Sequence, residues 1–159
     1  MTQEQSVVQR FYTALAAHDW RTANACYADD AVFGDEVFTH LNAQQVRAMW
    51  QMLLTRGKDL KVDYALLSQS PETARVRWTA TYTFSQTGRK VVNVIDSTLV
   101  LRDGQIVRQH DVFNFPRWAR QALGPVGLLL GWTDWLKRKV QKKAMASLEA
   151  FMQSATRAS

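Results

Sequence analysis

The sequence predicts an α+β domain: a cone-shaped, strongly curved antiparallel sheet, wrapped by N-terminal helices around one pocket, with an extra C-terminal helical segment. Two observations support this fold class. Apolar residues recur at helical spacing in residues 4–56 and then alternate as in strands over residues 60–115, an order that is typical of α+β proteins. A chain of 159 residues, 47% of them hydrophobic and 21% charged, also has the size and composition of one globular domain.

Three helices and one short strand are expected in the first third of the chain. The first helix is amphipathic, because its apolar residues lie on one side of a helix. Asp19 and Asn42 are expected to cap the second and third helices, since short polar side chains accept hydrogen bonds from the free N–H groups at a helix start. The expected bounds are residues 4–18, 20–27 and 42–56 for the helices and 31–33 for the strand.

Four strands are expected after residue 58, with turn residues between them. Asp103-Gly104 is the strongest turn signal in the chain, because both residue types tolerate the positive φ of a two-residue hairpin turn. Such a turn places Arg102 opposite Gln105 and sets the pairing along both strands. The expected strands are residues 60–67, 74–84, 89–101 and 105–115.

Counting outward from this turn places Asp96 opposite Asp111. Their side chains then share one face of the sheet with Val94 and Phe113, so that two carboxyl groups lie together among apolar neighbours. Two such groups cannot easily both ionise, and we expect one of them to keep its proton near neutral pH and to act as an acid. A β-bulge in either strand would shift the register by one residue and send one carboxylate to the opposite face.

The turn expected at Thr87-Gly88 leaves an alternative open for the Asp96–Asp111 pair. A two-residue turn at Thr87-Gly88 places Thr79 opposite Asp96, and Arg77 opposite Thr98. In that register Arg77 can pair with a carboxylate and weaken the case for a raised pKa. A further alternative is that both carboxylates are simply solvated.

The net charge of +6 comes entirely from the C-terminal segment. Residues 1–115 contain 12 Lys or Arg and 12 Asp or Glu, whereas residues 116–159 contain 8 and 2. A neutral body argues against a nucleic-acid surface, which needs basic residues along a groove. We expect residues 1–115 to form the domain and residues 116–159 to be a helical extension packed on it.

Two interpretations of the apolar part of this extension remain open. Its large side chains can close the open end of the cone or extend a dimer, or they can dock on lipid or on a partner. We favour the first, because a short apolar run is more often core than anchor, and we expect no membrane contact. The residues concerned are Leu128, Leu129, Leu130, Trp132 and Trp135.

Cysteine and histidine usage bears on location and on metal binding. The single cysteine, Cys26, cannot form an internal disulfide, which fits a reducing compartment. With no signal peptide or membrane-spanning run in the sequence, we expect a cytoplasmic protein. Three scattered histidines without carboxylates at ligand spacing predict no metal site, and no cofactor is expected.

Two stretches resemble a known family. The first is Tyr27-Ala28-Asp29-Asp30-Ala31-Val32-Phe33-Gly34-Asp35, after the N-terminal helix pair. The second is Val94-Ile95-Asp96 followed by Asp103-Gly104-Gln105-Ile106-Val107 and His110-Asp111. Both are similar to the SnoaL-like and ketosteroid-isomerase-like families of the nuclear transport factor 2 superfamily, over residues 5–115. The resemblance implies a hydrophobic pocket and pairing of two subunits through the outer sheet face.

The resemblance also implies roles for single residues. Asp35 matches the general base of ketosteroid isomerase, and Asp96 matches the carboxylic acid that donates a hydrogen bond to the oxyanion. The oxyanion tyrosine of that family falls at Phe11, with Tyr12 beside it, and the missing hydroxyl argues against steroid isomerisation. Asp111 matches the acidic residue on the last strand of SnoaL-like cyclases and limonene-epoxide-hydrolase-like enzymes.

The epoxide hydrolases carry Arg-x-Asp on the neighbouring strand, where this chain has Arg77-Trp78-Thr79. The loss of that aspartate argues against epoxide hydrolysis by the family mechanism. We also expect a homodimer, because the outer face would otherwise leave a row of apolar side chains in water. That row is Trp78, Tyr82, Phe84, Val91, Ile95 and Leu99.

Our leading hypothesis is a cofactor-independent acid/base enzyme, an isomerase, cyclase or dehydratase that acts on a small apolar carbonyl or polyketide-like molecule. The first alternative is a non-catalytic module that binds a small hydrophobic ligand. The second is a protein that docks on a partner or a membrane surface through the C-terminal segment. The candidate catalytic residues are Asp35, Asp96 and Asp111, and the candidate ligand-binding residues are Phe11, Tyr12, Trp50, Arg77, Thr79, Val94 and Phe113.

Overall fold

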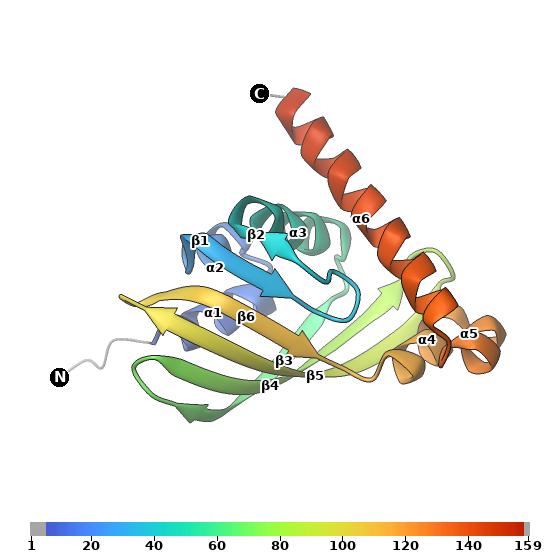
Figure 1. The fold of residues 1–159 in the computed structure, drawn as a ribbon, viewed down its shortest axis with the longest axis horizontal. Helices are drawn as coiled ribbons and strands as arrows, with labels where there is room; N and C mark the ends of the chain where they lie inside the picture. The colour runs from blue at the N-terminus through green and yellow to red at the C-terminus, as the bar shows by residue number, and fades with distance from the viewer. Residues whose placement is uncertain (1–5, 158–159) are drawn as a thin grey trace.

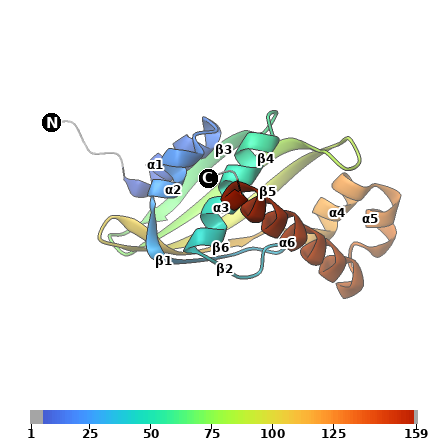
Figure 2. The same cartoon turned by 90° about the horizontal axis from the view of Figure 1, so that it is seen from above.

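The computed structural model describes residues 6–157, in which six helices cover one face and one end of a curved six-stranded sheet (Figure 1). Helices α4 and α5 lie at one end of the molecule, and α6 runs back from there across α3 (Figure 2). The predicted α+β class is confirmed. The helices are α1 (Val7–Ala16), α2 (Trp20–Ala25), α3 (Ala43–Arg56), α4 (Phe115–Leu123), α5 (Pro125–Leu130) and α6 (Asp134–Arg157). The strands are β1 (Tyr27–Gly34), β2 (Leu41–Asn42), β3 (Lys61–Gln69), β4 (Thr73–Phe84), β5 (Arg89–Arg102) and β6 (Gln105–Val112).

The strands lie side by side in the order β2-β1-β6-β5-β4-β3. β1 runs parallel to β6, whereas every other neighbouring pair of described strands is antiparallel. The sheet is therefore mixed rather than purely antiparallel. This one parallel pair has a consequence for function, because it brings the end of β1 level with the end of β6.

The predicted helix caps are confirmed. Asp19 accepts a hydrogen bond from the backbone N–H of Thr22 at 3.1 Å. Asn42 and Gln45 form a reciprocal capping box, with both bonds at 2.9 Å. Ser6 begins α1 with the same arrangement. Local chemistry therefore decides where these helices start.

The turn between β5 and β6 has the predicted length. Arg102 faces Gln105, and the two residues between them, Asp103 and Gly104, have φ of 53° and 71°. Positive φ at both central positions is what a type I′ hairpin turn requires. The prediction made for Asp103-Gly104 is confirmed.

A β-bulge close to this turn overturns the predicted pairing of Asp96 with Asp111. The ladder skips one residue of β6, Val107. Beyond the bulge Asp96 faces Val112, and Ser97 lies opposite Asp111. Because side chains alternate along a strand, the two carboxyl groups point to opposite faces of the sheet. The predicted acid pair is wrong.

The β4–β5 connection is also longer than predicted. Residues 85–88 form the loop, so the expected two-residue turn is wrong. As a result Arg77 faces Asp96, and Thr79 faces Val94. The alternative in which an arginine pairs with Asp96 is the one that the fold adopts.

The two faces of β4 and β5 are the reverse of the prediction. The row expected on the outer face lies on the side that the helices cover, where it consists of Trp78, Tyr82, Phe84, Val91, Ile95 and Leu99. The open face instead carries smaller β-branched residues, among them Val92 and Val94, which are 47% and 48% exposed. The reason is that the larger side chains remove more apolar area from water when they take the covered side.

The space between the sheet and helices α1 to α3 is filled by packed rings. Their centroids lie 5.0–6.2 Å apart, in edge-to-face or tilted arrangements, which aromatic pairs prefer. We call this cluster the aromatic interior; it consists of Phe11, Tyr12, Tyr27, Phe33, Trp50 and Trp78.

The C-terminal segment covers one end of the sheet with a second apolar cluster, in which Trp118 donates from Nε1 to the Tyr82 hydroxyl at 2.8 Å. The residues of the segment that are buried there are Trp118, Ala119, Ala122 and Leu136, and Phe115 directly before it is buried in the same cluster. The side chains that the sequence assigned to closing the cone are largely exposed, so that assignment is wrong within one subunit. They are Leu128, Leu129, Leu130, Trp132 and Trp135, with exposed fractions of 37% to 76%.

Candidate active site

Asp35 follows directly on β1, in the tight turn that leads to β2. Its Oδ1 accepts hydrogen bonds from the backbone N–H groups of Val37 and Phe38, at 2.7 and 2.6 Å. Its own N–H donates to the Phe38 carbonyl at 2.8 Å. Both side-chain bonds end on Oδ1, which leaves Oδ2 without a donor among residues 6–157. The carboxyl group is therefore held in place with one oxygen available to another molecule.

Asp111 lies on β6 and is 2% exposed. The Ser97 hydroxyl donates to Oδ1 at 2.5 Å, and Trp78 donates from Nε1 to the same hydroxyl at 3.0 Å. Gln109 lies two residues earlier on the same face and places Nε2 3.2 Å from Oδ1 and 3.4 Å from Oδ2. Side chains from three neighbouring strands thus hold this carboxyl group inside the protein.

Burial raises the pKa of both carboxyl groups above the usual value for aspartate. The pKa of Asp111 rises to about 7: burial is the largest cause, the hydrogen bond from Ser97 opposes it, and the charge of Asp35 adds to it. The pKa of Asp35 rises to about 6, because burial outweighs the hydrogen bonds from two backbone N–H groups. Near neutral pH, Asp35 is mainly ionised while Asp111 is partly protonated. The charge of Asp35 therefore favours the protonated form of Asp111.

The parallel pairing of β1 and β6 explains why these two carboxyl groups interact. The last registered pair is Gly34 with His110, and the next residue on each strand is Asp35 and Asp111. Gly34 is needed at this point because an added Cβ would lie 2.8 Å from the carbonyl oxygen of Thr39. Glycine therefore lets the chain fold back directly before Asp35.

A second chain of hydrogen bonds joins helix α3 to Asp111. Trp50 donates from Nε1 to the Tyr27 hydroxyl at 2.9 Å, and that hydroxyl donates to Oε1 of Gln109 at 2.5 Å. Burial raises the pKa of Tyr27 well above its usual value, so its hydroxyl stays neutral. Gln109 accepts from Tyr27 and donates to Asp111, and the network fixes the orientation of its amide.

The hydroxyl group of Tyr12 is buried and has no well-formed hydrogen bond among residues 6–157, although the Ser97 side chain lies near enough to interact with it. Burial and then the charge of Asp111 raise its pKa, whereas Ser97 lowers it. Such a group is a neutral donor, and a buried donor without a partner is costly. An acceptor oxygen on a bound molecule would satisfy it.

The structure brings together six of the ten predicted site residues. These lie on the covered side of the sheet: Phe11, Tyr12, Asp35, Trp50, Asp111 and Phe113. The other four lie on the open face: Arg77, Thr79, Val94 and Asp96. Arg77 and Asp96 form an ion pair there with 2.8 Å between Nε and Oδ1, and both side chains are more than half exposed. The bulge in β6 is the reason that Asp96 and Asp111 are separated.

Sequence reasoning missed Ser97, Gln109 and Tyr27 as members of the site. One signal was available for Gln109, since it lies two residues before Asp111 on the same strand and must share its face. Ser97 could be found only with the shifted register, because the unbulged register placed it on the other side from Asp111. Tyr27 begins the stretch that resembles the SnoaL-like family, but the sequence alone indicated no role for it.

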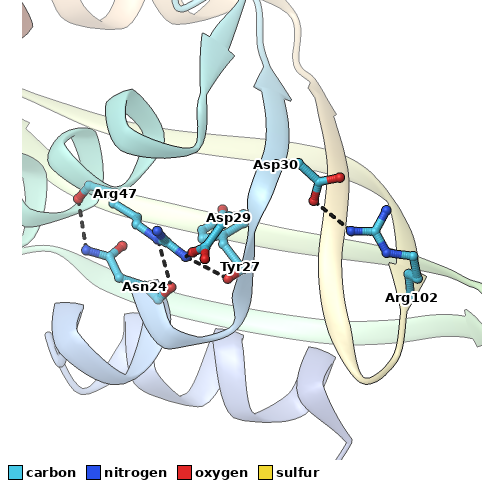
Figure 3. Close-up of polar contacts among 6 residues, drawn as sticks. All are labelled: Asn24, Tyr27, Asp29, Asp30, Arg47 and Arg102. Carbon is cyan, nitrogen blue, oxygen red and sulfur yellow. Dashed lines mark hydrogen bonds and ion pairs between the residues drawn. The ribbon is translucent and has the colours of Figure 1, made fainter.

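Of the two aspartates of that stretch, Asp29 lies toward Arg47 and Asp30 toward Arg102, and both side chains are exposed (Figure 3). Arg47 on α3 donates to the Tyr27 carbonyl at 2.8 Å and to Oδ1 of Asp29 at 3.1 Å. Asp30 pairs with Arg102 at the β5–β6 turn, at 2.7 Å. These contacts tie the start of β1 to α3 and to the hairpin, and so they position Tyr27 rather than act on a ligand.

Helix α6 holds the loop that carries Asp35. Lys137 pairs with Glu36, with 2.5 Å between Nζ and Oε2, and Gln141 donates to the Glu36 carbonyl at 3.0 Å. Surface hollows of about 390 and 290 Å³ are lined by residues from Asn114 onward and not by Asp35 or Asp111. Because Phe11 and Tyr12 are fully buried, a ligand that reaches Asp111 must displace packed side chains.

Residues 6–157 contain no group of three His, Cys, Asp or Glu side chains arranged to hold a metal ion. In the same range, no helix is both long enough and apolar enough to span a bilayer. The titratable groups that do gather inside the protein are Tyr12, Tyr27, Asp35 and Asp111.

Comparison with known proteins agrees with this architecture. Residues 8–109 match the sequence profile of the SnoaL-like domain. IdmH, a "putative polyketide cyclase" from Streptomyces antibioticus, has a TM-score of 0.61 at 20% identity over 72% of this chain and 94% of its own. A hypothetical protein with a ketosteroid isomerase-like fold from Catenulispora acidiphila has a TM-score of 0.66 at 12% identity, over 84% and 99%. An LEH-like epoxide hydrolase of M. tuberculosis has a TM-score of 0.59 at 18% identity, over 78% and 92%. No curated protein sequence matches the chain.

Proposed function

Because the chain belongs to the SnoaL-like domain family, we propose that it is a cofactor-independent enzyme that moves protons on a small apolar carbonyl or polyketide-like molecule. The observation that carries this proposal is the position of Asp35 and Asp111 one residue beyond the last pair of two parallel strands. Asp111 is buried and Asp35 is half-buried, and both lie next to aromatic side chains that suit an apolar ligand. Two carboxyl groups with separated pKa values suit the roles of base and acid.

In the proposed reaction, Oδ2 of Asp35 removes a proton from the carbon next to the carbonyl group. The electron pair of the broken C–H bond forms the C=C bond of an enol, and the carbonyl oxygen takes a proton from Asp111 while Tyr12 donates a hydrogen bond to it. In an isomerisation, Asp35 returns its proton to a different carbon and Asp111 recovers its own. In a cyclisation, the enol carbon attacks a second carbonyl of the same molecule, and the oxygen of that carbonyl takes the proton from Asp35. The enol oxygen becomes a carbonyl oxygen again and returns its proton to Asp111.

Proton exchange tests this proposal without knowledge of the natural substrate. A panel of small cyclic ketones and enones is incubated with the protein in D₂O, and the loss of the signal of the proton next to the carbonyl is followed by NMR. We expect exchange with the wild type, none with Asp35→Asn, and unchanged exchange with Asp96→Asn, whose carboxyl is on the open face. Exchange that survives in Asp35→Asn would contradict the proposed base.

The second candidate is a module that binds a small hydrophobic ligand without turnover. One observation favours it: Ser97 and Gln109 already donate hydrogen bonds to the Asp111 carboxyl group. The carboxyl group is therefore satisfied inside the protein and less available to a substrate. The same NMR samples separate the two candidates. Binding of panel members without any exchange supports the module, and exchange supports the enzyme.

We further propose that the protein is a homodimer, formed through the open face of the sheet. Val92, Val94 and Val112 are 45% to 48% exposed there, on two neighbouring strands. Light scattering at micromolar concentration should report twice the subunit mass of 18.2 kDa. Val94→Glu should give a monomer, whereas Leu67→Glu, at an exposed apolar residue of β3, should not. A monomeric wild type would contradict the proposal.

A further inference from the structure

The largest exposed apolar side chains of the protein gather on α5 and at the start of α6. Leu128, Leu129, Trp132 and Trp135 are 62%, 69%, 76% and 55% exposed. We call this surface the α5 corner; it consists of Val126, Leu128, Leu129, Leu130, Trp132 and Trp135. Nothing in residues 6–157 covers it, although apolar surface of this kind is normally buried or used for binding.

Two glycines explain why these side chains point outward. A Cβ added at Gly127 would lie 1.8 Å from the carbonyl oxygen of Ala119, so α5 packs with its backbone directly against α4. At Gly131 an added Cβ would meet the Ala119 side chain at 3.1 Å. The small residues thus face the protein and the large apolar residues face outward, which is the reverse of an ordinary amphipathic surface helix.

Positive charge surrounds the α5 corner. A hollow of about 390 Å³ between α4 and α5 is lined by Arg117 and Arg120 on one side and by Leu128 and Trp132 on the other. Lys139 lies over the ring of Trp135, 4.8 Å from its centroid. Between residues 116 and 148 the sequence holds seven Lys or Arg and one acid. An occupant of this surface must therefore offer apolar surface and negative charge together.

We propose that the α5 corner docks on an anionic membrane surface, with Leu128, Leu129 and Trp132 inserted among the acyl chains and Arg117 and Arg120 bound to lipid phosphates. A bilayer interface provides an apolar layer directly beneath dense negative charge, and tryptophan and basic residues are typical of segments that lie in it. The corner lies at an extremity of the molecule in both views (Figures 1 and 2), so it can reach a flat surface without hindrance from the rest of the fold. We expected no membrane contact because a short apolar run is more often core than anchor, but in this structure the run is exposed.

Vesicle co-sedimentation of the full chain tests this proposal. Vesicles of phosphatidylcholine alone are compared with vesicles that also contain about 30% phosphatidylglycerol, since each basic residue near an anionic surface adds to binding. We expect binding to the anionic vesicles that weakens as salt is raised. Leu129→Ala with Trp132→Ala should lower the partition coefficient by about tenfold or more. Arg117→Gln with Arg120→Gln should lower it by about tenfold on anionic vesicles.

Leu67→Ala is the matched control, because Leu67 is a half-exposed leucine on β3, away from the corner. It should bind vesicles like the wild type. Circular dichroism should show all variants folded, since the substituted side chains are exposed. Three outcomes would overturn the proposal: no binding to anionic vesicles, equal binding of wild type and the Leu129/Trp132 variant, or an oligomer in solution that Trp132→Ala dissociates, which would mean that a second copy covers the corner.

Discussion

Ser97 and Asp111 face each other across β5 and β6, and the serine hydroxyl lies 2.5 Å from Oδ1 of the aspartate. Because this hydroxyl accepts a hydrogen bond from Trp78, its own proton is directed to the carboxyl group. The bond favours the ionised form of Asp111, whereas burial favours the neutral form. These are the two largest causes of the pKa of about 7, to which the charge of Asp35 adds.

The free energy of unfolding should fall as pH rises from about 4 to 8. The pKa values of Asp35 and Asp111, about 6 and about 7, lie above their unfolded value, so the folded state keeps protons that the unfolded chain releases. This stabilisation is complete below pH 4 and is lost as pH passes the folded pKa values. Denaturant unfolding across this range checks the direction, and stability that rises between pH 5 and 8 would contradict it.

Asp111→Asn should remove most of this pH dependence. The amide cannot ionise, and its oxygen can still accept from Ser97. We expect the variant to be more stable than the wild type at pH 8 by on the order of 2–4 kcal/mol, from about 1.4 kcal/mol per pKa unit, and to match it below about pH 4, where the unfolded wild type also keeps its proton. Asp96→Asn is the control and should keep the wild-type pH profile, because Asp96 is exposed.

Ser97→Ala should raise the pKa of Asp111 further. The substitution removes the hydrogen bond that most favours the carboxylate and leaves Trp78 Nε1 without its acceptor. The inflection of the stability profile should move to higher pH, with a larger loss of stability at pH 8 than at pH 5. Thr98→Ala, one residue along on the open face, should leave the inflection unchanged.

If the protein catalyses proton transfer, the rate should peak between about pH 6 and 7. The base, Asp35, must be ionised, which requires a pH above its pKa of about 6. The acid, Asp111, must be protonated, which requires a pH below its pKa of about 7. Exchange rates measured from pH 4 to 9 should therefore give a narrow bell. In Asp111→Asn the alkaline limb should disappear and the maximum rate should fall.

Tyr27→Phe should destabilise the fold by about 1–3 kcal/mol. The substitution removes the acceptor of Trp50 Nε1 and the donor to Gln109, and it leaves two buried polar groups unsatisfied. Tyr64→Phe is the matched control, since the Tyr64 hydroxyl makes an exposed contact of 3.2 Å with Thr13 and should lose less. Equal losses in denaturant unfolding would show that the buried network adds nothing.

Removal of residues 116–159 should expose the end of the sheet. Trp118, Ala119 and Ala122 cover Val91 and Tyr82 in the second apolar cluster, so a chain that ends at Phe115 should bind a hydrophobic dye strongly or aggregate. A chain that lacks only residues 153–159, whose described side chains are exposed, should behave like the full chain. Unchanged dye binding after the larger deletion would mean that the segment is an independent element.

Helix starts and the last hairpin turn were predictable because their causes are local. Asn42 caps a helix through a bond to Gln45 three residues away, and Asp103-Gly104 forms its turn from the φ preferences of two residues. Asp35 could also be identified as a candidate site residue from the sequence, because residues 27–35 resemble the SnoaL-like family. None of these features depends on what lies opposite in the fold.

By itself the sequence determined the α+β class, the caps, the Asp103-Gly104 turn and the alternation along each strand. Only the tertiary structure decided the register beyond Val107, the covered face of β4 and β5, and the pairing of β1 with β6 that sets Asp35 beside Asp111. The physical reason is that side chains alternate with a period of two, so one bulged residue reverses every side chain beyond it. Which side then becomes the core depends on the helices that pack there, and the chain buried Trp78, Ile95 and Leu99 because they remove the most apolar area from water.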